Sequence, residues 1–155
     1  MDRLSEEIVK TCTLKGVHIG FAESLTGGLI SANIVNIPGA SAVLEGSIVS
    51  YSNEVKINVL GVDPEVIRTE GAVSEPCAKQ MAEGARKVLG ADFTVSVTGI
   101  AGPGGGSPQK PVGTVYIGVS APDLNYARKF LFEGNREEIR DLTVLEALKM
   151  LKEVL

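Results

Sequence analysis

The residues from Glu23 to Gly28 could take part in chemistry, because they combine hydroxyl groups, a carboxylate and glycines directly after an apolar run. The stretch reads Glu23-Ser24-Leu25-Thr26-Gly27-Gly28 and follows a predicted strand, Val17 to Ala22. One hydroxyl here suits the N-cap of the next helix, predicted over Gly28 to Val35, and the glycines let another backbone or a ligand approach its first turn. A plain helix cap explains one hydroxyl well. It explains the acid, the second hydroxyl and both glycines less well.

A second candidate group surrounds the end of the strand predicted over Gly46 to Tyr51. Tyr51 closes this strand, Asn53 lies in the turn that follows, and Lys56 falls in the first turns of the next helix. Functional side chains often lie at such junctions, so Tyr51 and Lys56 could point to the same side of the sheet edge. The alternative is a solvated helix face, which is where most lysines lie.

The third candidate is a glycine-rich loop that follows the predicted strand Phe93 to Val97. The strand gives way at Thr98-Gly99 to a loop that contains Gly102, Gly104 and Gly105. Ordering glycines costs much backbone entropy, which favours a loop that needs positive φ or close approach to a ligand. Backbone N–H groups in such loops bind anions, phosphate above all. The spacing matches neither GxGxxG nor GxxxxGK[ST], and a mobile surface loop is the alternative.

Two arginines, Arg136 and Arg140, lie one turn apart at the start of the last predicted helix, Arg136 to Val154. The helix dipole favours acids at this end, so another interaction should account for two cations. A phosphate or carboxylate ligand would do so through bidentate hydrogen bonds. Ion pairs with Glu133 or Glu137 are the alternative.

The elements that carry these groups alternate between strand and helix, which predicts a three-layer α/β/α sandwich with a mixed, mostly parallel sheet. In this class of fold the site is expected at the carboxyl ends of the central strands. Two late strands alternate apolar and polar residues and are interpreted as an antiparallel pair at one side of the sheet. The other predicted elements are a helix from Leu4, a helical turn over Pro64 to Thr69, a helix over Glu75 to Leu89, and the paired strands Gly113 to Ser120 and Tyr126 to Phe132.

Length and composition exclude several classes of function. The 155 residues predict one domain, residues 1–155, and the net charge of −4 without a basic run argues against a nucleic-acid partner. Two distant cysteines and one histidine, His18, are too few ligands for a metal site, and no cofactor is expected. Neither a signal peptide nor a run of about 18 apolar residues is present, so we expect a cytoplasmic protein without a membrane partner.

Six stretches, in this order, resemble the C-terminal domain of the CinA family, whose members include nicotinamide mononucleotide deamidases. They are Ala22-Glu23-Ser24-Leu25-Thr26-Gly27-Gly28, Pro38-Gly39-Ala40-Ser41, Tyr51-Ser52-Asn53-Glu54-Val55-Lys56, Gly71-Ala72-Val73-Ser74, Val97-Thr98-Gly99-Ile100-Ala101-Gly102-Pro103-Gly104-Gly105 and Lys110-Pro111-Val112-Gly113-Thr114-Val115. The resemblance covers nearly the whole chain, and Gln109 departs from it where the family favours an acid. It implies a free-standing form without the molybdopterin-binding-like N-terminal domain, and a homo-oligomer.

The resemblance implies hydrolysis of the carboxamide of nicotinamide mononucleotide to nicotinate mononucleotide and ammonia, by a Ser/Lys dyad without metal. Lys56 is the matching lysine, and it can accept a proton if burial or a nearby cation lowers its pKa. Ser41 and Ser24 compete as the nucleophile, and we favour Ser41. Ser24 and Thr98 would then orient the amide or stabilise its oxyanion, and Tyr51 would relay a proton or position the lysine.

The same resemblance implies a set of substrate-binding residues. Arg140, with Arg136 as the second choice, would hold the phosphate or steady the developing charge. The glycine loop from Gly99 to Gly106 and the turn from Thr26 to Gly28 would cradle the ribose phosphate, and Glu23 and Asn53 complete the expected set. The alternative function is a non-catalytic module that binds nucleotide phosphate. Hydrolysis of a pyrophosphate such as ADP-ribose would need an acidic metal cluster, which the sequence lacks.

Overall fold

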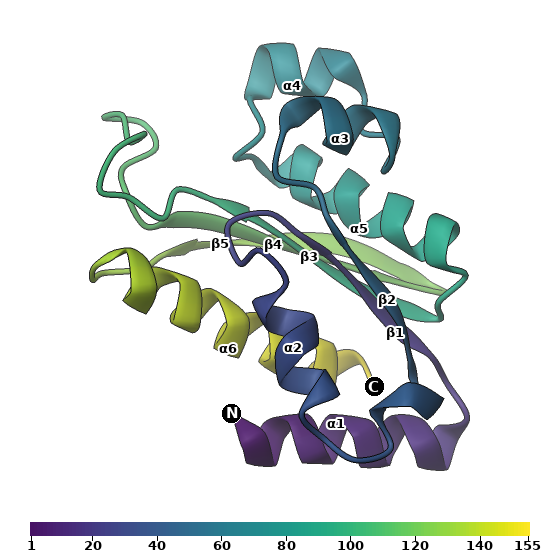
Figure 1. Cartoon of the computed structure of the whole chain (residues 1–155). Coiled ribbons are helices and arrows are strands. Elements are labelled where there is room, and N and C mark those ends of the chain that lie inside the picture. The colour runs from purple at the N-terminus through teal and green to yellow at the C-terminus, as the bar shows by residue number, and fades with distance from the viewer.

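The computed structural model describes residues 1–155 and contains one five-stranded sheet, with strand order β2-β1-β3-β4-β5 (Figure 1). The strands are β1 (Ile19–Glu23), β2 (Leu44–Val49), β3 (Phe93–Gly99), β4 (Thr114–Ala121) and β5 (Leu124–Leu131). β1 pairs in parallel with β2 and β3, whereas β4 pairs antiparallel with β3 and β5. Only β4 therefore runs against the other strands, which confirms the predicted mixed sheet and its antiparallel pair.

Helices cover both faces of the sheet, which confirms the predicted three-layer sandwich (Figure 1). One layer holds α1 (Asp2–Lys15), α2 (Leu29–Val35) and α6 (Arg136–Val154), and the other holds α3 (Asn53–Asn58), α4 (Pro64–Glu70) and α5 (Glu75–Leu89). A short 3-10 helix, η1 (Ala40–Ala42), precedes β2. None of the helices has both the length and the apolar character that crossing a bilayer requires.

Two apolar clusters hold the layers together. The larger one fills the space between the sheet and the layer of α1, α2 and α6, and it includes Phe21, Ile117 and Leu148, which are fully buried. The smaller one lies under α5 and includes Cys77 and Met81. Every residue of β1 is buried, as expected for a central strand covered on both faces.

Local signals define the long helices well. In α5 the Ser74 hydroxyl accepts from the Cys77 N–H, and in α6 Asn135 and Glu138 form a capping box. Both helices therefore begin and end where the sequence predicts. Helix α2 differs, since its N-cap Gly28 has a φ of 106° and contributes no side-chain cap.

Candidate active site

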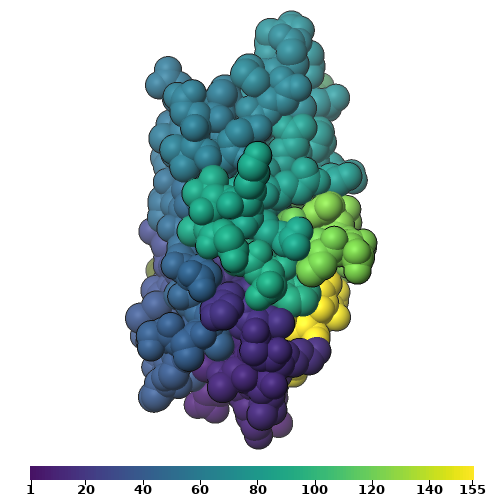
Figure 2. Space-filling model, turned by 90° about the vertical axis from the view of Figure 1, so that its right-hand side faces the viewer, coloured from purple at the N-terminus to yellow at the C-terminus, as the bar shows by residue number.

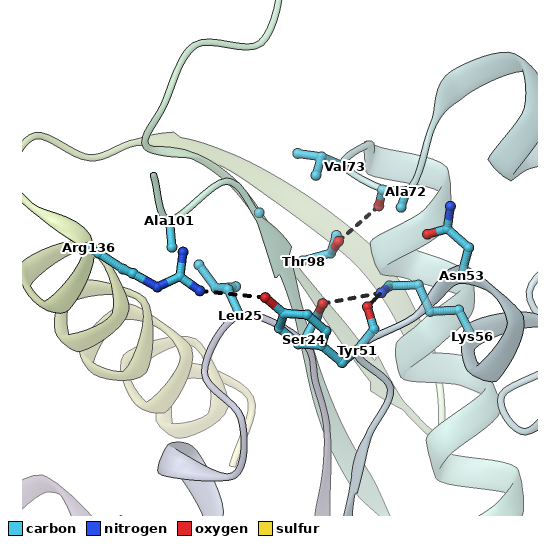
Figure 3. A pocket seen from close by; sticks show the side chains of 11 residues that line it. Ser24, Leu25, Tyr51, Asn53, Lys56, Ala72, Val73, Thr98, Ala101 and Arg136 are labelled. Atoms are coloured by element: carbon cyan, nitrogen blue, oxygen red, sulfur yellow. Dashed lines mark hydrogen bonds between the residues drawn. The ribbon is translucent and has the colours of Figure 1, made fainter. Parts of the chain in front are cut away.

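A pocket opens at the edge of the sheet where the parallel strands β1, β2 and β3 end (Figure 3). Its volume is about 230 Å³. The carboxyl ends of parallel strands are the expected place for a site in this class of fold, so the predicted location is where a pocket lies. The lining residues are Ser24, Leu25, Tyr51, Asn53, Lys56, Ala72, Val73, Thr98, Gly99, Ala101 and Arg136.

Lys56 is the buried cation of this pocket, with 2% of its surface exposed. Its Nζ donates to Ser24 Oγ at 3.2 Å and to the carbonyl oxygens of Ser50 at 2.7 Å and Tyr51 at 3.1 Å. Burial lowers the pKa of Lys56 from its usual value, because the charged form loses its hydration. The neutral amine therefore forms at a lower pH here than on an exposed lysine.

The partners of Lys56 determine where its lone pair points after it loses a proton. An ammonium has three N–H donors, whereas the neutral amine has two donors and one lone pair. The carbonyls of Ser50 and Tyr51 can only accept, so they retain the two remaining N–H groups. The lone pair then faces the Ser24 hydroxyl, which is the arrangement that a general base needs.

Local structure holds the lysine in this position. Lys56 lies on α3, a short helix that follows β2 and is capped by Ser52, whose hydroxyl accepts from the Val55 N–H at 3.2 Å. Cys77 of α5 is fully buried near Lys56, and burial raises the pKa of its thiol to about 11. The thiol therefore stays protonated and offers no competing nucleophile.

Ser41, the nucleophile favoured from the sequence, lies apart from Lys56. It is exposed in η1 and lines a different, mainly apolar hollow with Val35, Ile37 and Leu44 among others. η1 precedes β2 and α3 follows it, so the six residues of β2 separate the two sites by about 20 Å. The structure instead brings Ser24 into contact with Lys56, which reverses the expected order of the two serines.

The two arginines have different partners. Arg136 lines the pocket, where its guanidinium donates to the Gly102 carbonyl at 2.7 Å and lies 3.5 Å from the Tyr51 hydroxyl. Arg140 does not line the pocket and instead donates to the Leu25 and Thr26 carbonyls at 2.8 and 3.0 Å. One helical turn, about 5.4 Å, therefore separates an arginine that lines the pocket from one that holds the turn after Ser24. The structure thus brings Arg136 to the pocket, and not Arg140, which the sequence favoured.

Glu23, which the sequence analysis expects to bind substrate, is fully buried and does not line the pocket. It therefore cannot reach a ligand there. Its carboxylate accepts from the N–H groups of Gly28, Ile30 and Ser31 and from the Thr26 and Ser47 hydroxyls. An internal anion thus already occupies the N-terminus of α2. The turn from Thr26 to Gly28 is therefore not free to cradle a phosphate, and Thr26 and both glycines have structural roles.

The end of β3 contributes Thr98 and Gly99 to the pocket, as predicted. The Thr98 hydroxyl donates to the Ala72 carbonyl at 2.9 Å (Figure 3), which holds the segment before α5 against the site. A Cβ on Gly99 would come within 2.6 Å of the Val115 side chain, so glycine here permits close packing on β4. Gly104 and Gly105 are exposed and outside the pocket lining, and Gly102 contributes its carbonyl to Arg136.

The charge of the pocket differs from that of the whole protein. Its lining includes the cations Lys56 and Arg136 and no carboxylate, although the net charge of the chain is −4. All N–H groups of Lys56 are used internally, so Arg136 is the cation left to bind an anionic ligand. Tyr51 is 64% exposed and forms part of the rim beside it.

Sequence reasoning missed the apolar part of the lining. Leu25, Val73 and Ala101 line the pocket, but none of them carries a chemical group that marks it as functional. Each lies within one of the six stretches that resemble the CinA family, since Leu25 follows Ser24, Val73 precedes Ser74, and Ala101 belongs to the glycine-rich loop. Adjacency to these motifs is the one signal that could have identified them.

Comparison with known proteins identifies relatives across the whole chain. The model of the CinA C-terminal domain matches residues 1–155. A CinA-like protein of Fervidobacterium nodosum is 47% identical over 152 residues, which are 97% of this chain and 37% of the relative. A CinA-like protein of Dictyoglomus thermophilum is 48% identical over 150 residues, which are 96% of this chain and 36% of the relative. The chain thus spans little more than a third of the length of these curated relatives.

Solved structures agree with this assignment over almost the full length of both chains. A competence/damage inducible protein of Agrobacterium tumefaciens has a TM-score of 0.96 at 43% identity, covering 98% of this chain and 93% of the other. A CinA superfamily protein of Escherichia coli has a TM-score of 0.95 at 28% identity, covering 99% of this chain and 90% of the other. The names of these proteins specify no substrate.

Proposed function

Because the chain belongs to the CinA C-terminal domain family, we propose that it hydrolyses the carboxamide of nicotinamide mononucleotide, with Ser24 as nucleophile and Lys56 as general base. The observation that carries this proposal is the hydrogen bond between Lys56 Nζ and Ser24 Oγ inside the pocket. The family resemblance of the sequence motifs supplies the substrate, and the geometry supplies the choice of serine. Two backbone carbonyls that orient the lysine lone pair toward Ser24 support the same roles.

The first half of the reaction forms an ester on Ser24. Ser24 Oγ attacks the carboxamide carbon while its proton passes to the neutral Lys56 amine, and the carbonyl π electrons move onto the oxygen. The tetrahedral intermediate then collapses, so that the C–N bond breaks and the Lys56 ammonium returns the proton to the leaving nitrogen. Ammonia leaves, and the nicotinoyl group remains bound to Ser24 Oγ.

The second half releases the acid. Lys56, again neutral, takes a proton from a water molecule as the water oxygen attacks the ester carbon. The second intermediate collapses with cleavage of the bond to Ser24 Oγ, and Lys56 returns the proton to the serine. The products are nicotinate mononucleotide and ammonia, and both catalytic residues recover their starting states.

Arg136 is the proposed partner of the substrate phosphate. It is the pocket cation whose N–H groups are not all used inside the protein, and no lining carboxylate competes with an anion. Charge-assisted, bidentate hydrogen bonds make arginine suited to phosphate. Asn53 and Tyr51 line the same pocket, and we expect both to contact the nucleotide.

Ammonia release from nicotinamide mononucleotide tests this function, with nicotinamide, nicotinamide riboside and NAD as comparison substrates. We expect release from the mononucleotide, weak or no release from the compounds without a terminal phosphate, and the same rate when a chelator is present. No release from any compound, together with retained binding of the mononucleotide, would support the non-catalytic phosphate-binding module instead.

A further inference from the structure

The turn that follows Ser24 contains two main-chain N–H groups without an acceptor. The N–H groups of Leu25 and Thr26 donate to no group of the chain, although Leu25 is 5% exposed and Thr26 is fully buried. Buried N–H groups are nearly always hydrogen-bonded, so an unpaired donor calls for an explanation. Both follow the proposed nucleophile, but only Leu25 lines its pocket, whereas Thr26 lies outside the lining.

The three peptide groups of this turn are held by hydrogen bonds on their carbonyl side. The Ser24 carbonyl accepts from the Gly27 N–H at 3.1 Å, and the carbonyls of Leu25 and Thr26 accept from Arg140. In a planar trans peptide the C=O and the N–H of the next residue point in opposite directions. Fixing the Ser24 carbonyl therefore fixes the N–H group of Leu25 on the opposite side of its peptide plane. The Gly27 N–H that makes this bond belongs to the peptide whose Thr26 carbonyl Arg140 holds, so Arg140 fixes the Leu25 N–H through Gly27.

Arg140 is well suited to this role. Its planar guanidinium stays charged and presents several donors in a fixed arrangement, so one side chain holds two neighbouring carbonyls. It makes no ion pair and does not line the pocket, so its two hydrogen bonds to the turn are the polar contacts that hold its guanidinium. Glu23 meanwhile occupies the donors at the start of α2, which leaves Leu25 and Thr26 as the free donors of this segment.

We propose that the N–H group of Leu25 is an oxyanion donor of the Ser24 reaction and that Arg140 is the positioning residue that holds the turn which aims it. This rests on the proposed function, since the oxyanion is the carbonyl oxygen of the tetrahedral intermediate. A strand, a nucleophile on a tight turn and a helix follow one another here. In hydrolases with that arrangement, the N–H after the nucleophile is an oxyanion donor.

The test compares Arg140→Met with Arg86→Met, because Arg86 also donates to a backbone carbonyl, that of Asp92, but away from the pocket. We expect Arg140→Met to lower kcat for nicotinamide mononucleotide by about 10²- to 10³-fold with little change in KM, the loss typical of a missing oxyanion donor. Arg86→Met should keep the wild-type rate. Arg140→Lys, which can hold one carbonyl, should fall between the two. An Arg140→Met enzyme with wild-type kcat would overturn the proposal.

A thioamide analogue of the substrate separates a positioning role from general damage. Sulfur is a weaker acceptor than oxygen, so an intact hole should favour the amide strongly over the thioamide. Arg140→Met should lose much of this preference, because the Leu25 N–H group is no longer aimed at the oxyanion. If the variant is slower but keeps the wild-type preference, Arg140 has a merely structural role and the proposal fails.

A serine-directed fluorophosphonate makes the test independent of the substrate. Ser24 Oγ forms a bond to phosphorus, fluoride leaves, and the serine proton passes to Lys56, while negative charge develops on the phosphoryl oxygen. We expect slower labelling of Ser24 in Arg140→Met than in the wild type or Arg86→Met. This result would support the hole even if nicotinamide mononucleotide were not hydrolysed, whereas equal labelling rates would overturn it.

Gly27→Ala is a second variant that leaves Arg140 in place. Gly27 has a φ of +61°, which side chains rarely adopt, so alanine should strain the turn. Its Cβ would make only an ordinary contact, 3.7 Å, with the Arg140 guanidinium. We expect the same reduced kcat and reduced preference for the amide. Wild-type values for both quantities in a folded Gly27→Ala protein would contradict the proposed geometry.

Discussion

The two edges of the parallel strands each present a serine, and they differ in what surrounds it. At the carboxyl edge Ser24 is 8% exposed and its hydroxyl contacts the Lys56 amine. At the amino edge Ser41 is exposed in a hollow of mainly apolar residues. A serine hydroxyl is a weak nucleophile without an adjacent base, so the partner and not the serine distinguishes the two edges.

The charges at the two edges differ as well. At the amino edge, where β1 and β3 begin, the His18 ring nitrogens lie 3.8 Å from the carboxylates of Glu45 and Asp92. Figure 2 shows the molecule from this side. The pocket at the carboxyl edge has two cations and no lining carboxylate. An anionic substrate should therefore prefer the carboxyl edge, where the hydroxyl and the amine also meet.

Among substitutions at the two edges, replacing Ser24 should reduce kcat the most. We expect Ser24→Ala to lower kcat by about 10⁴-fold or more, because the step that forms the ester has no nucleophile left. Binding of nicotinamide mononucleotide, measured by calorimetry, should stay close to that of the wild type. A Ser24→Ala enzyme with substantial activity would show that another group attacks the amide.

Lys56→Met should give the next largest effect, a decrease in kcat of about 10²- to 10⁴-fold, as expected for loss of a general base. In the wild type kcat/KM should rise with pH as the amine loses its proton, and should level off below about pH 10.4, the usual pKa of lysine, because burial lowers the pKa of Lys56. The exposed Lys79 provides the control substitution, Lys79→Met. An unchanged pH profile in the Lys56 variant would remove this lysine from the mechanism.

The same lysine should make stability depend on pH. Its folded pKa is lowered while the unfolded pKa stays near about 10.4, so the unfolded chain binds more protons between the two values. The free energy of unfolding should therefore fall as pH decreases from about 10.4 through the lowered pKa. Denaturant titrations should show this slope in the wild type and a flatter one in Lys56→Met. Equal slopes would mean that Lys56 is not held in a desolvated site.

Arg136→Met should have a smaller effect that depends on the substrate phosphate. Hydrogen bonds to charged groups contribute about 1.5–3 kcal/mol, so kcat/KM for the mononucleotide should fall by about 10- to 10²-fold, mostly through KM. The rate with nicotinamide riboside, which lacks the phosphate, should be the same in both proteins. An equal loss with both substrates would contradict a phosphate role for Arg136.

Ser41→Ala should have the smallest effect, because Ser41 lies at the edge without a base. We expect kcat and KM within about twofold of the wild type, as for most surface substitutions. Steady-state kinetics on Ser41→Ala beside Ser24→Ala measures the contrast directly. A large loss of activity in the Ser41 variant would contradict the claim that only the serine at the carboxyl edge takes part in catalysis.

Much of the fold could be predicted from local sequence patterns. The capped helices α5 and α6 and the buried strand β3 were predictable, because caps, period and β-branched runs are local signals. The topology also held information about Ser41, since a residue before a parallel strand must lie at the edge opposite to one that follows it. Ser41 precedes β2 and Lys56 follows it, so the two could not share a site.

Other features depend on which partner a side chain takes, both within one turn and between distant segments. The sequence suggested a phosphate cradle at the start of α2, but the buried Glu23 carboxylate already accepts those N–H groups. The four-residue spacing of Arg136 and Arg140 likewise could not tell which guanidinium meets the turn after Ser24. Side-chain partners more than a hundred residues apart are set by packing, not by local pattern.

The central claim is that Ser24 at the carboxyl edge forms the covalent bond with the substrate. The most direct measurement is to quench a single turnover of nicotinamide mononucleotide with acid and to locate the acyl group by peptide mass spectrometry. The account predicts a nicotinoyl nucleotide ester on the peptide that contains Ser24, and none in Ser24→Ala. An ester on the peptide that contains Ser41 would contradict it.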